Sequence, residues 1–331
     1  MKKFLIYTLS LALALVTFVG CKKTDATVIK VNEVTDSIFY APFYVAIEKG
    51  FFEEEGIKIE LTNGAGSDVS MTALLSGGAD IALLGPETTV YVARQNKKDA
   101  PKLFAQLTKR DGCFLISRNK EDNFNWNNLV GKEVIIGRQG GLPAMTFEYV
   151  VNQMGMTNGN NITLRKDIQF ALMGPTFDNG VGDYVTLFEP TASEFVSAGK
   201  GHIVASVGEK SGEIPYTGFA CLESYLDKNE ETVEKFLRAM YKSLNYVKTA
   251  PTSEVADYLA KHFTTTSKTS CENALINYLN ADTWVDNMAM TETAFTNLIN
   301  VIKNAGENVD GVTYNDVVDG ALANKIYNSL K

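Results

Sequence analysis

Polar side chains and glycines gather where predicted strands end and predicted helices begin. The candidates for a binding site are Asp36, Ser37, Tyr40, Gly66, Ser67, Glu87, Thr88, Arg138, Gly140, Gly141 and Glu189. In open α/β sheets, ligands bind outside the carboxyl ends of the strands, where loops lead into helix N-termini. The sequence therefore predicts that these loops line a cleft that holds a small molecule.

The loops favour two different kinds of ligand. Arg138, followed by two glycines and a helix predicted over 143–154, suits an anion, because a guanidinium, free backbone N–H groups and a helix dipole all favour negative charge. Glu87 and Glu189 accept hydrogen bonds when they are ionised. Together they favour a ligand that carries donors, such as an aminopyrimidine.

Most of these side chains also have an ordinary structural role open to them. Asp36 or Ser37 can cap the helix after the first strand, and Glu87 can cap a later one. Arg138 can bond to the opposite lobe instead of to a ligand. Tyr40 has fewer structural uses, and an aromatic ring beside an α/β cleft suits stacking on a ligand.

Little in the sequence indicates catalysis or metal binding. His202 and His262 are isolated, and Cys113, Cys221 and Cys271 form no CxxC motif. We therefore expect no metal, no cofactor and no enzymatic activity. Because Cys113 and Cys221 lie in the two strands expected to join the lobes, we also expect them to lie near each other.

The N-terminus predicts export. A positively charged start, a short apolar stretch over 4–19 and the pair Gly20-Cys21 are typical of a secretory signal. The apolar stretch is at the short end of the roughly 17–25 residues needed to span a bilayer. Its end resembles the bacterial lipobox, with Phe18 where Leu is usual, although an ordinary signal with an incidental cysteine is the alternative. We predict a signal peptide over 1–20, a lipid on Cys21, a tether over 21–27 and a location on the extracytoplasmic face of the cell membrane.

Composition limits the partners. The formal charge of −8 becomes −10 when Lys2 and Lys3 leave with the signal, and so acidic a chain argues against nucleic-acid binding. With 45% hydrophobic and 21% charged residues, the chain has an ordinary globular composition. Its mature length exceeds what one hydrophobic core usually serves, so two lobes are expected.

Strands, loops and helices alternate along the first two thirds of the chain. Strands are predicted over 28–34, 57–61, 81–84, 102–108, 113–117, 133–136, 162–164, 184–188, 203–206 and 216–222. Helices are predicted over 41–52, 69–76, 88–95 and 143–154, with a helical or irregular piece near 170–177. After residue 230 the pattern is helical, over 232–249, 252–263, 271–280, 291–305 and 317–329. This order predicts mostly parallel α/β sheets with helices on both faces.

The segment 38–60 carries a family resemblance. Its phrases Ala41–Ala46 and Gly50–Phe52 are similar to the opening of periplasmic-type solute-binding proteins of ABC importers, in the family that includes alkanesulfonate, nitrate and thiamine-precursor binders. The similarity continues in order through 73–82, 85–87, 182–190 and 233–240. It therefore extends over nearly the whole mature chain.

The resemblance implies a fold and a hinge. It implies a type II periplasmic binding protein, with two α/β lobes, two crossover strands and a helical C-terminal part. Lobe I would comprise 28–111 and 218–331, and lobe II would comprise 112–217. The ligand would lie between the lobes.

The resemblance also implies a function. The protein would be a lipid-anchored, monomeric solute-binding subunit that passes its ligand to a permease with a cytoplasmic ATPase. A thiamine-precursor-like pyrimidine or another nitrogen heterocycle is the expected ligand. A sulfonate, nitrate or carboxylate anion is the alternative, and a pyrimidine-synthase-like enzyme is a third possibility.

Overall fold

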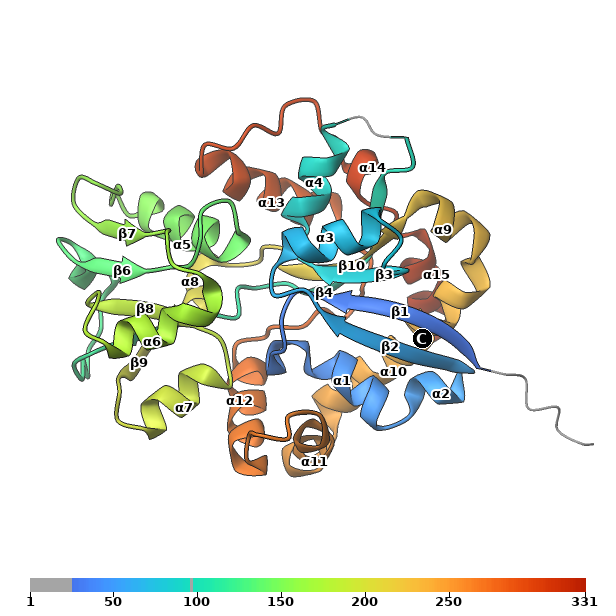
Figure 1. Cartoon of the computed structure of the whole chain (residues 1–331), viewed down its shortest axis with the longest axis horizontal. Helices are drawn as coiled ribbons and strands as arrows, with labels where there is room; N and C mark the ends of the chain where they lie inside the picture. The colour runs from blue at the N-terminus through green and yellow to red at the C-terminus, as the bar shows by residue number, and fades with distance from the viewer. Residues whose placement is uncertain (1–25, 96–97) are drawn as a thin grey trace, which may run out of the picture.

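Two five-stranded sheets, one in each lobe, organise the chain (Figure 1). The computed structural model describes residues 26–95 and 98–331. The first sheet has the order β2-β1-β3-β10-β4, from Ile57–Asn63, Thr27–Glu33, Ile81–Leu84, Thr217–Leu222 and Pro101–Thr108. The second has the order β7-β6-β8-β5-β9, from Thr163–Arg165, Glu133–Ile135, Tyr184–Leu187, Phe114–Ser117 and His202–Ser206. The chain thus has the two-lobed α/β architecture that was predicted.

Both sheets are mixed rather than nearly all parallel. In the first, β1 runs parallel to β2 and β3, whereas β10 is antiparallel to β3 and β4. In the second, β6 runs parallel to β7 and β8, whereas β5 is antiparallel to β8 and β9. The antiparallel strands β5 and β10 are the ones that follow each passage of the chain between the sheets.

Most predicted helices are present, with one difference near the start of the described chain. The helix predicted over 41–52 is two helices, α1 over Ala41–Glu48 and α2 over Phe51–Glu54. Gly50 separates them with a φ of 81°, a left-handed conformation that glycine adopts without steric cost. Next come α3 over Ser67–Leu75 and α4 over Glu87–Ala93, which lead away from the ends of β2 and β3.

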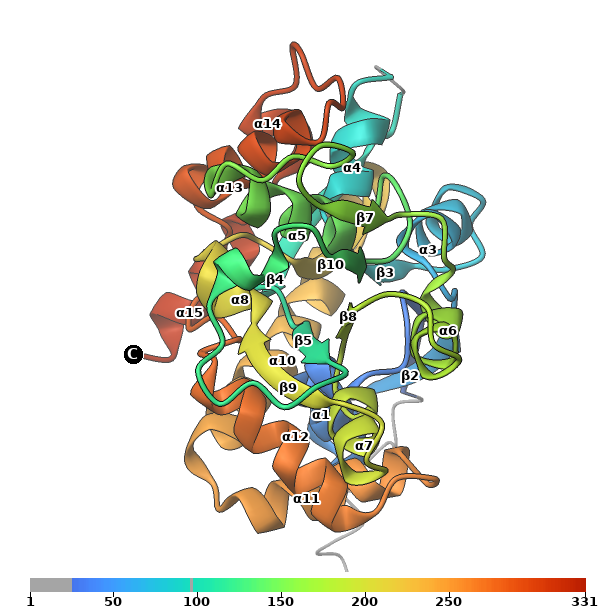
Figure 2. The same cartoon turned by 90° about the vertical axis from the view of Figure 1, so that its left-hand side faces the viewer.

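Lobe II holds four α-helices around its sheet, as Figure 2 shows from that end of the molecule. They are α5 over Leu142–Gln153, α6 over Met173–Asp178, α7 over Thr191–Ser197 and α8 over Val207–Ser211. A 3-10 turn, η3 over Phe170–Leu172, precedes α6. The sequence patterns did not predict α7 and α8, because both are too short to show a helical repeat.

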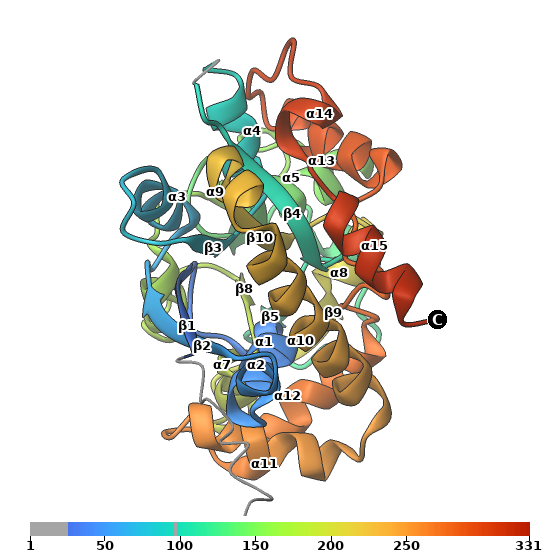
Figure 3. The same cartoon turned by 90° about the vertical axis from the view of Figure 1, so that its right-hand side faces the viewer.

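The C-terminal part is helical and covers the first sheet. It comprises α9 Glu223–Lys228, α10 Glu230–Thr249, α11 Thr252–His262, α12 Lys268–Asn280, α13 Glu292–Asn304, α14 Tyr314–Val317 and α15 Ala321–Ser329. Figure 3 shows α10 crossing this lobe diagonally, with α15 beside it. Phe236 of α10 is fully buried against Phe43, Phe52, Phe104 and Phe219. This aromatic core fixes the strands whose ends form the site.

The chain crosses between the lobes twice, and the two crossings lie side by side. The backbone N–H of Ile214 donates to the carbonyl of Lys109 at 2.9 Å, and that of Tyr216 donates to the carbonyl of Thr108 at 3.1 Å. The hydroxyls of Thr108 and Thr217 are 2.6 Å apart. The lobe boundaries at 111/112 and 217/218 stay a prediction; Thr217, assigned there to lobe II, is the first residue of β10 in the first sheet.

The expected proximity of Cys113 and Cys221 is wrong. Thr217 pairs with Thr108 at the lobe II end of β10, whereas Cys221 pairs with Lys102 at the other end. Four residues of extended strand measure about 13 Å, and Cys113 lies beyond Thr108 on the opposite side. Both thiols are free and buried. The cysteines are apart because β5 and β10 belong to different sheets, and Cys221 lies near the end of β10 that is remote from the crossing.

The predicted signal peptide and Cys21 lie outside the described residues, as does most of the tether. Within 26–95 and 98–331, no helix is long and apolar enough to cross a membrane. In the same part of the chain, no group of three or more His, Cys, Asp or Glu side chains is arranged to hold a metal ion.

Candidate ligand-binding site

A cavity of about 400 Å³ lies between the two lobes. Lobe I contributes residues from the loops after β1, β2 and β3, and lobe II contributes the loop between β6 and α5 together with η3. Cavities of this size are typical of small-molecule sites. The cavity thus lies where loops from the carboxyl ends of strands in both sheets meet, as the strand order predicted.

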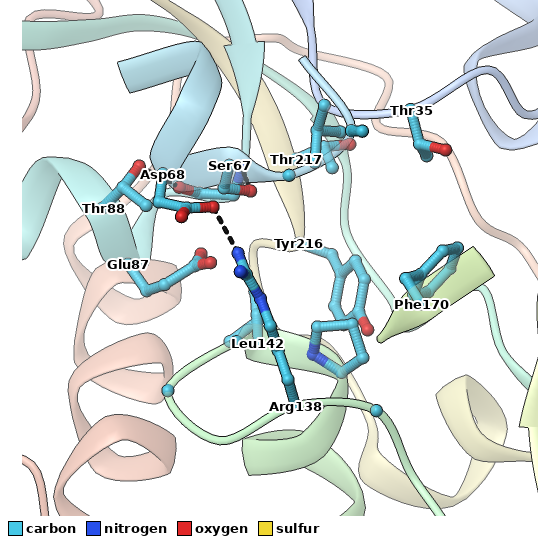
Figure 4. A pocket seen from close by; sticks show the side chains of 18 of the residues that line it. Thr35, Ser67, Asp68, Glu87, Thr88, Arg138, Leu142, Phe170, Tyr216 and Thr217 are labelled. Carbon is cyan, nitrogen blue, oxygen red and sulfur yellow. Dashed lines mark hydrogen bonds and ion pairs between the residues drawn. The ribbon is translucent and has the colours of Figure 1, made fainter. Parts of the chain in front are cut away.

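The structure brings most of the predicted site residues to this cavity. Those that line it are Tyr40, Gly66, Ser67, Glu87, Thr88, Arg138, Gly140 and Gly141. They come from both lobes, and Figure 4 shows several of their side chains facing one another. Any molecule held here would contact lobe I and lobe II at once.

Asp36 and Ser37 do not line the cavity, contrary to the prediction. Asp36 Oδ1 lies 3.2 Å from Nε2 of His262, at the end of α11. The Ser37 hydroxyl accepts from the backbone N–H of Phe39 at 3.2 Å and donates to the carbonyl of Glu189 at 2.8 Å. Ser37 therefore caps a short 3-10 turn, η1 over Ile38–Tyr40, and ties it to lobe II.

Glu189 lies behind the cavity and supports the hinge. Its side chain is only 1% exposed, and its carboxylate accepts hydrogen bonds from Ser193 and, at 2.6 Å, from Nδ2 of Asn277. The Tyr278 hydroxyl accepts from the Glu189 backbone N–H at 2.9 Å. Because these partners occupy the carboxylate, Glu189 joins α7 of lobe II to α12 rather than contacting a ligand.

Glu87 is the buried acceptor of the cavity. Its side chain is 2% exposed, and its Oε2 has no hydrogen-bond partner among the residues that the structure describes. Gly85 makes room for it, since a Cβ at that position would collide with the carboxyl group. Burial raises the pKa of Glu87 to about 7, against a smaller lowering by the backbone N–H groups of Glu87 and Leu142. A buried carboxyl oxygen without a partner, as Oε2 is, favours a ligand that donates a hydrogen bond to it.

Arg138 and Asp68 form an ion pair across the cavity from opposite lobes, as the dashed line in Figure 4 shows. The side chains of Arg138 and Asp68 are 41% and 58% exposed. Although burial raises the pKa of Asp68, the hydrogen bond and charge of Arg138 outweigh it and lower that pKa. Asp68 was not among the predicted site residues, although Gly66 and Ser67 directly before it were. It lies in the first turn of α3, where acidic residues are favourable in any helix, so the sequence gave no signal that distinguishes it from a solvated carboxylate.

Aromatic rings form one side of the cavity, a surface that we term the aromatic wall: Phe170, Phe188 and Tyr216. The ring centroids of Phe170 and Phe188 are 5.4 Å apart, and those of Phe188 and Tyr216 are 6.2 Å apart. Phe170 is 39% exposed although it is a large apolar residue. The wall suits a planar ligand, because aromatic rings attract flat molecules through stacking and edge contacts. The sequence did not predict these three residues as part of the site.

Behind the wall lies a buried carboxyl at the crossing between the lobes. Asp111 is 2% exposed, and its Oδ1 accepts from the backbone N–H of Cys113 at 2.6 Å. Its Oδ2 has no partner in the described part of the chain. Burial raises the pKa of Asp111 to about 7. Burial likewise raises the pKa of Glu33, at the end of β1, to about 7.

These three carboxyl groups predict how stability depends on pH. Glu33, Glu87 and Asp111 hold a proton up to about pH 7 in the folded protein, whereas their ordinary pKa values are 4.5, 4.5 and 3.8. The folded state therefore binds more protons than the unfolded chain between about pH 4.5 and 7. We expect the free energy of unfolding to fall as pH rises from 5 to 8, by up to about 1.4 kcal/mol per pH unit for each group.

Urea unfolding at pH 5, 6, 7 and 8 measures this dependence. The E87Q variant removes one of the three titrations and should show a shallower decline than the wild-type protein. Asp68 and the other carboxyls whose pKa is lowered titrate below this window. A free energy of unfolding that rises between pH 5 and 8 would contradict the prediction.

Comparison with known proteins places the chain in a family. The model of the NMT1/THI5-like family matches residues 38–254. Over 308 residues, the chain is 42% identical to YtlA of Bacillus subtilis (strain 168), whose name describes it as an inferred binding protein, and the match covers 93% of this chain and 92% of YtlA. It is 22% identical over 237 residues to the 4-amino-5-hydroxymethyl-2-methylpyrimidine phosphate synthase of Aspergillus parasiticus, covering 67% and 66% of the two chains.

A solved structure shares the fold. The ligand-binding component of an ABC-type import system from Staphylococcus aureus superposes with a TM-score of 0.72 at 16% identity, over 91% of this chain and 99% of that one. The periplasmic nitrate-binding protein NrtA from Synechocystis PCC 6803 superposes with a TM-score of 0.73 at 18% identity, over 93% of this chain and 90% of that one, so the fold is that of periplasmic binding proteins. With the family model and YtlA both matching most of its length, the chain belongs to the NMT1/THI5-like family.

Proposed function

We propose that this protein is the extracytoplasmic solute-binding component of an ABC importer, and that it captures a small molecule between its lobes without chemical conversion. The observation that carries the proposal is the cavity lined by residues of both lobes. A ligand that contacts both lobes favours their closed arrangement, and a permease can distinguish that arrangement from the open one. The name of the Staphylococcus aureus structure supports an import role, and the name of YtlA supports binding over catalysis.

The ligand that fits this cavity best is a planar nitrogen heterocycle with hydrogen-bond donors. The Glu87 carboxyl offers an unpaired buried acceptor, and the aromatic wall offers faces for stacking. A thiamine-precursor-like pyrimidine with an exocyclic amine meets both requirements. The similarity to a synthase that makes a pyrimidine phosphate supports this ligand class.

The same similarity makes a pyrimidine synthase the second candidate function. Against it, the residues that line the cavity include no histidine and no cysteine within the described part of the chain. Cys113 is buried next to Asp111, and burial raises the pKa of its thiol well above the ordinary value, which disfavours a reactive thiolate.

A thermal-shift screen tests the proposal. We expect an uncharged aminopyrimidine to raise the melting temperature of the wild-type protein, since a ligand at 100 times its Kd stabilises the folded state by about 2.7 kcal/mol. The shift should shrink in E87A and persist in full in E53A, which changes an exposed glutamate of α2 remote from the cavity. If only anions stabilise the wild-type protein, the proposed ligand class is wrong, and if no small molecule of any charge does so, the proposed function is wrong.

The proposal includes a lipid anchor on Cys21, which lies outside the described residues. In the bacterial cell, the C21A variant should leave the membrane fraction and appear in the soluble fraction, because it loses the acylated residue. Its melting temperature should equal that of the wild-type protein. C271A, which changes a buried thiol of α12, is the control and should stay with the membrane. Retention of C21A in washed membranes would contradict the anchor.

A further inference from the structure

The anion site expected around Arg138 is occupied by the protein's own groups. Arg138 Nη2 donates to Oδ1 of Asp68, which belongs to the opposite lobe. Of the described residues that line the cavity, Arg138 is the cationic one, whereas Asp68 and Glu87 both carry carboxyl groups. The charge that would attract an anionic ligand is therefore already balanced within the cavity.

The backbone donors beside Arg138 are also engaged. The N–H of Gln139 donates to the carbonyl of Lys166 at 2.9 Å, and the N–H of Gly141 donates to the carbonyl of Arg138 at 3.3 Å. The N–H of Leu142, at the start of α5, faces the Glu87 carboxyl. A helix N-terminus that would otherwise suit an anion thus has an acidic side chain of the other lobe in front of it.

The backbone around Asp68 is shaped for this contact. A Cβ on Gly66 would lie 2.7 Å from Oδ1 of Asp68 and 3.0 Å from Nη2 of Arg138. A side chain at position 66 would therefore require the ends of these two partly exposed side chains to shift.

We propose that Asp68 acts as an internal anion that occupies Arg138 and excludes anionic ligands from the cleft, which makes it a specificity-determining residue. This inference rests on the proposed binding function. Under this proposal, neutral or cationic ligands bind in the cleft. Sulfonates and nitrate would have to displace Asp68 from Arg138 and would also come close to the Glu87 carboxyl group. The cost of displacing a paired carboxylate disfavours these anions.

Calorimetry with two simple anions tests the inference. Sodium methanesulfonate and sodium nitrate are titrated, at constant ionic strength set with chloride, into the wild-type protein, D68A and the double variant D68A/R138A. We expect no saturable binding to the wild-type protein. D68A should bind both anions at least tenfold more tightly than the wild-type protein, and the double variant should lose that gain. Since the Asp68–Arg138 pair is exposed, all three proteins should share the same circular dichroism spectrum.

Two results would overturn the inference. Equal anion affinity in the wild-type protein and D68A would show that Asp68 excludes nothing, although binding in the cleft would then stand. Absence of anion binding in D68A would show that Arg138 is not an anion site even when it is free. Failure of the proposed function is a separate result, namely that no compound of any charge stabilises the wild-type protein in the thermal-shift screen.

Discussion

Replacing Glu87 by alanine is expected to weaken ligand binding by about 5- to 150-fold, the largest effect of any single change in the cavity. The reason is that the ligand's donor would lose its acceptor inside the cavity, and an unpaired buried polar group costs about 1–3 kcal/mol. Glu87 is 2% exposed, so little water replaces it as a partner. Isothermal titration calorimetry with the compound that gives the largest thermal shift measures the loss.

The matched variants separate charge from hydrogen bonding. E87Q keeps an acceptor oxygen but removes the negative charge. It should therefore retain much of the wild-type affinity for a neutral ligand that donates a hydrogen bond, and it should lose more of the affinity for a cationic ligand. E53A should bind as the wild-type protein does, because Glu53 is exposed on α2. Wild-type affinity in E87A would show that the ligand does not use this carboxyl.

Replacing Trp284 by alanine is expected to lower the free energy of unfolding by about 3–5 kcal/mol, as is typical of a fully buried tryptophan. Trp284 is 1% exposed, and its Nε1 donates to the carbonyl of Phe39 at 2.9 Å. Phe39 directly precedes Tyr40, which lines the cavity. The variant should therefore also bind ligand more weakly, because η1 loses a hydrogen bond that fixes its position.

Trp126 provides the control for this change. It lies half-buried in a 3-10 turn of lobe II, η2 over Trp126–Leu129, and contacts Phe124 and Phe147 instead of the cavity. W126A should lose less stability than W284A and keep the wild-type affinity. Urea unfolding followed by circular dichroism gives the free energies. Equal losses of stability in the two variants would contradict the central role of Trp284.

The sequence was informative wherever function depends on local order along the chain. Strands followed by glycine-rich or acidic loops predicted the cavity, because the carboxyl ends of strands meet at one edge of a sheet. Tyr40, Ser67, Glu87 and Arg138 were found in this way. The resemblance of segments such as 41–46 then predicted the correct family, which the family model and YtlA confirm.

The sequence was less informative where function depends on contacts between distant segments. Glu189 follows a strand as the site residues do, but its carboxylate is taken by Asn277 of α12, which is 88 residues away. Asp36 similarly lies against His262 of α11. Tyr216 was predicted only as the start of a strand, since local sequence does not show which face of a crossing segment meets the cavity.

Arg138 also shows that sequence alone does not determine contacts between distant segments. A guanidinium before a helix N-terminus suits an anion, and it suits an ion pair with the other lobe equally well. Only the position of α3 relative to α5 decides between them, and that position brings Asp68 to Arg138. The preference for a donor-bearing ligand thus follows from tertiary structure, whereas the presence of a cleft follows from sequence.

The most direct test of the account is a crystal structure of the mature protein with the compound that gives the largest thermal shift. We predict electron density for that compound between the two lobes, with a donor atom about 2.7–3.2 Å from a carboxylate oxygen of Glu87 and its plane against the aromatic wall of Phe170, Phe188 and Tyr216. Asp68 should remain paired with Arg138 in that complex. Density at a site that involves one lobe alone, or a ligand that contacts neither Glu87 nor the wall, would contradict the proposal that this cleft binds the ligand.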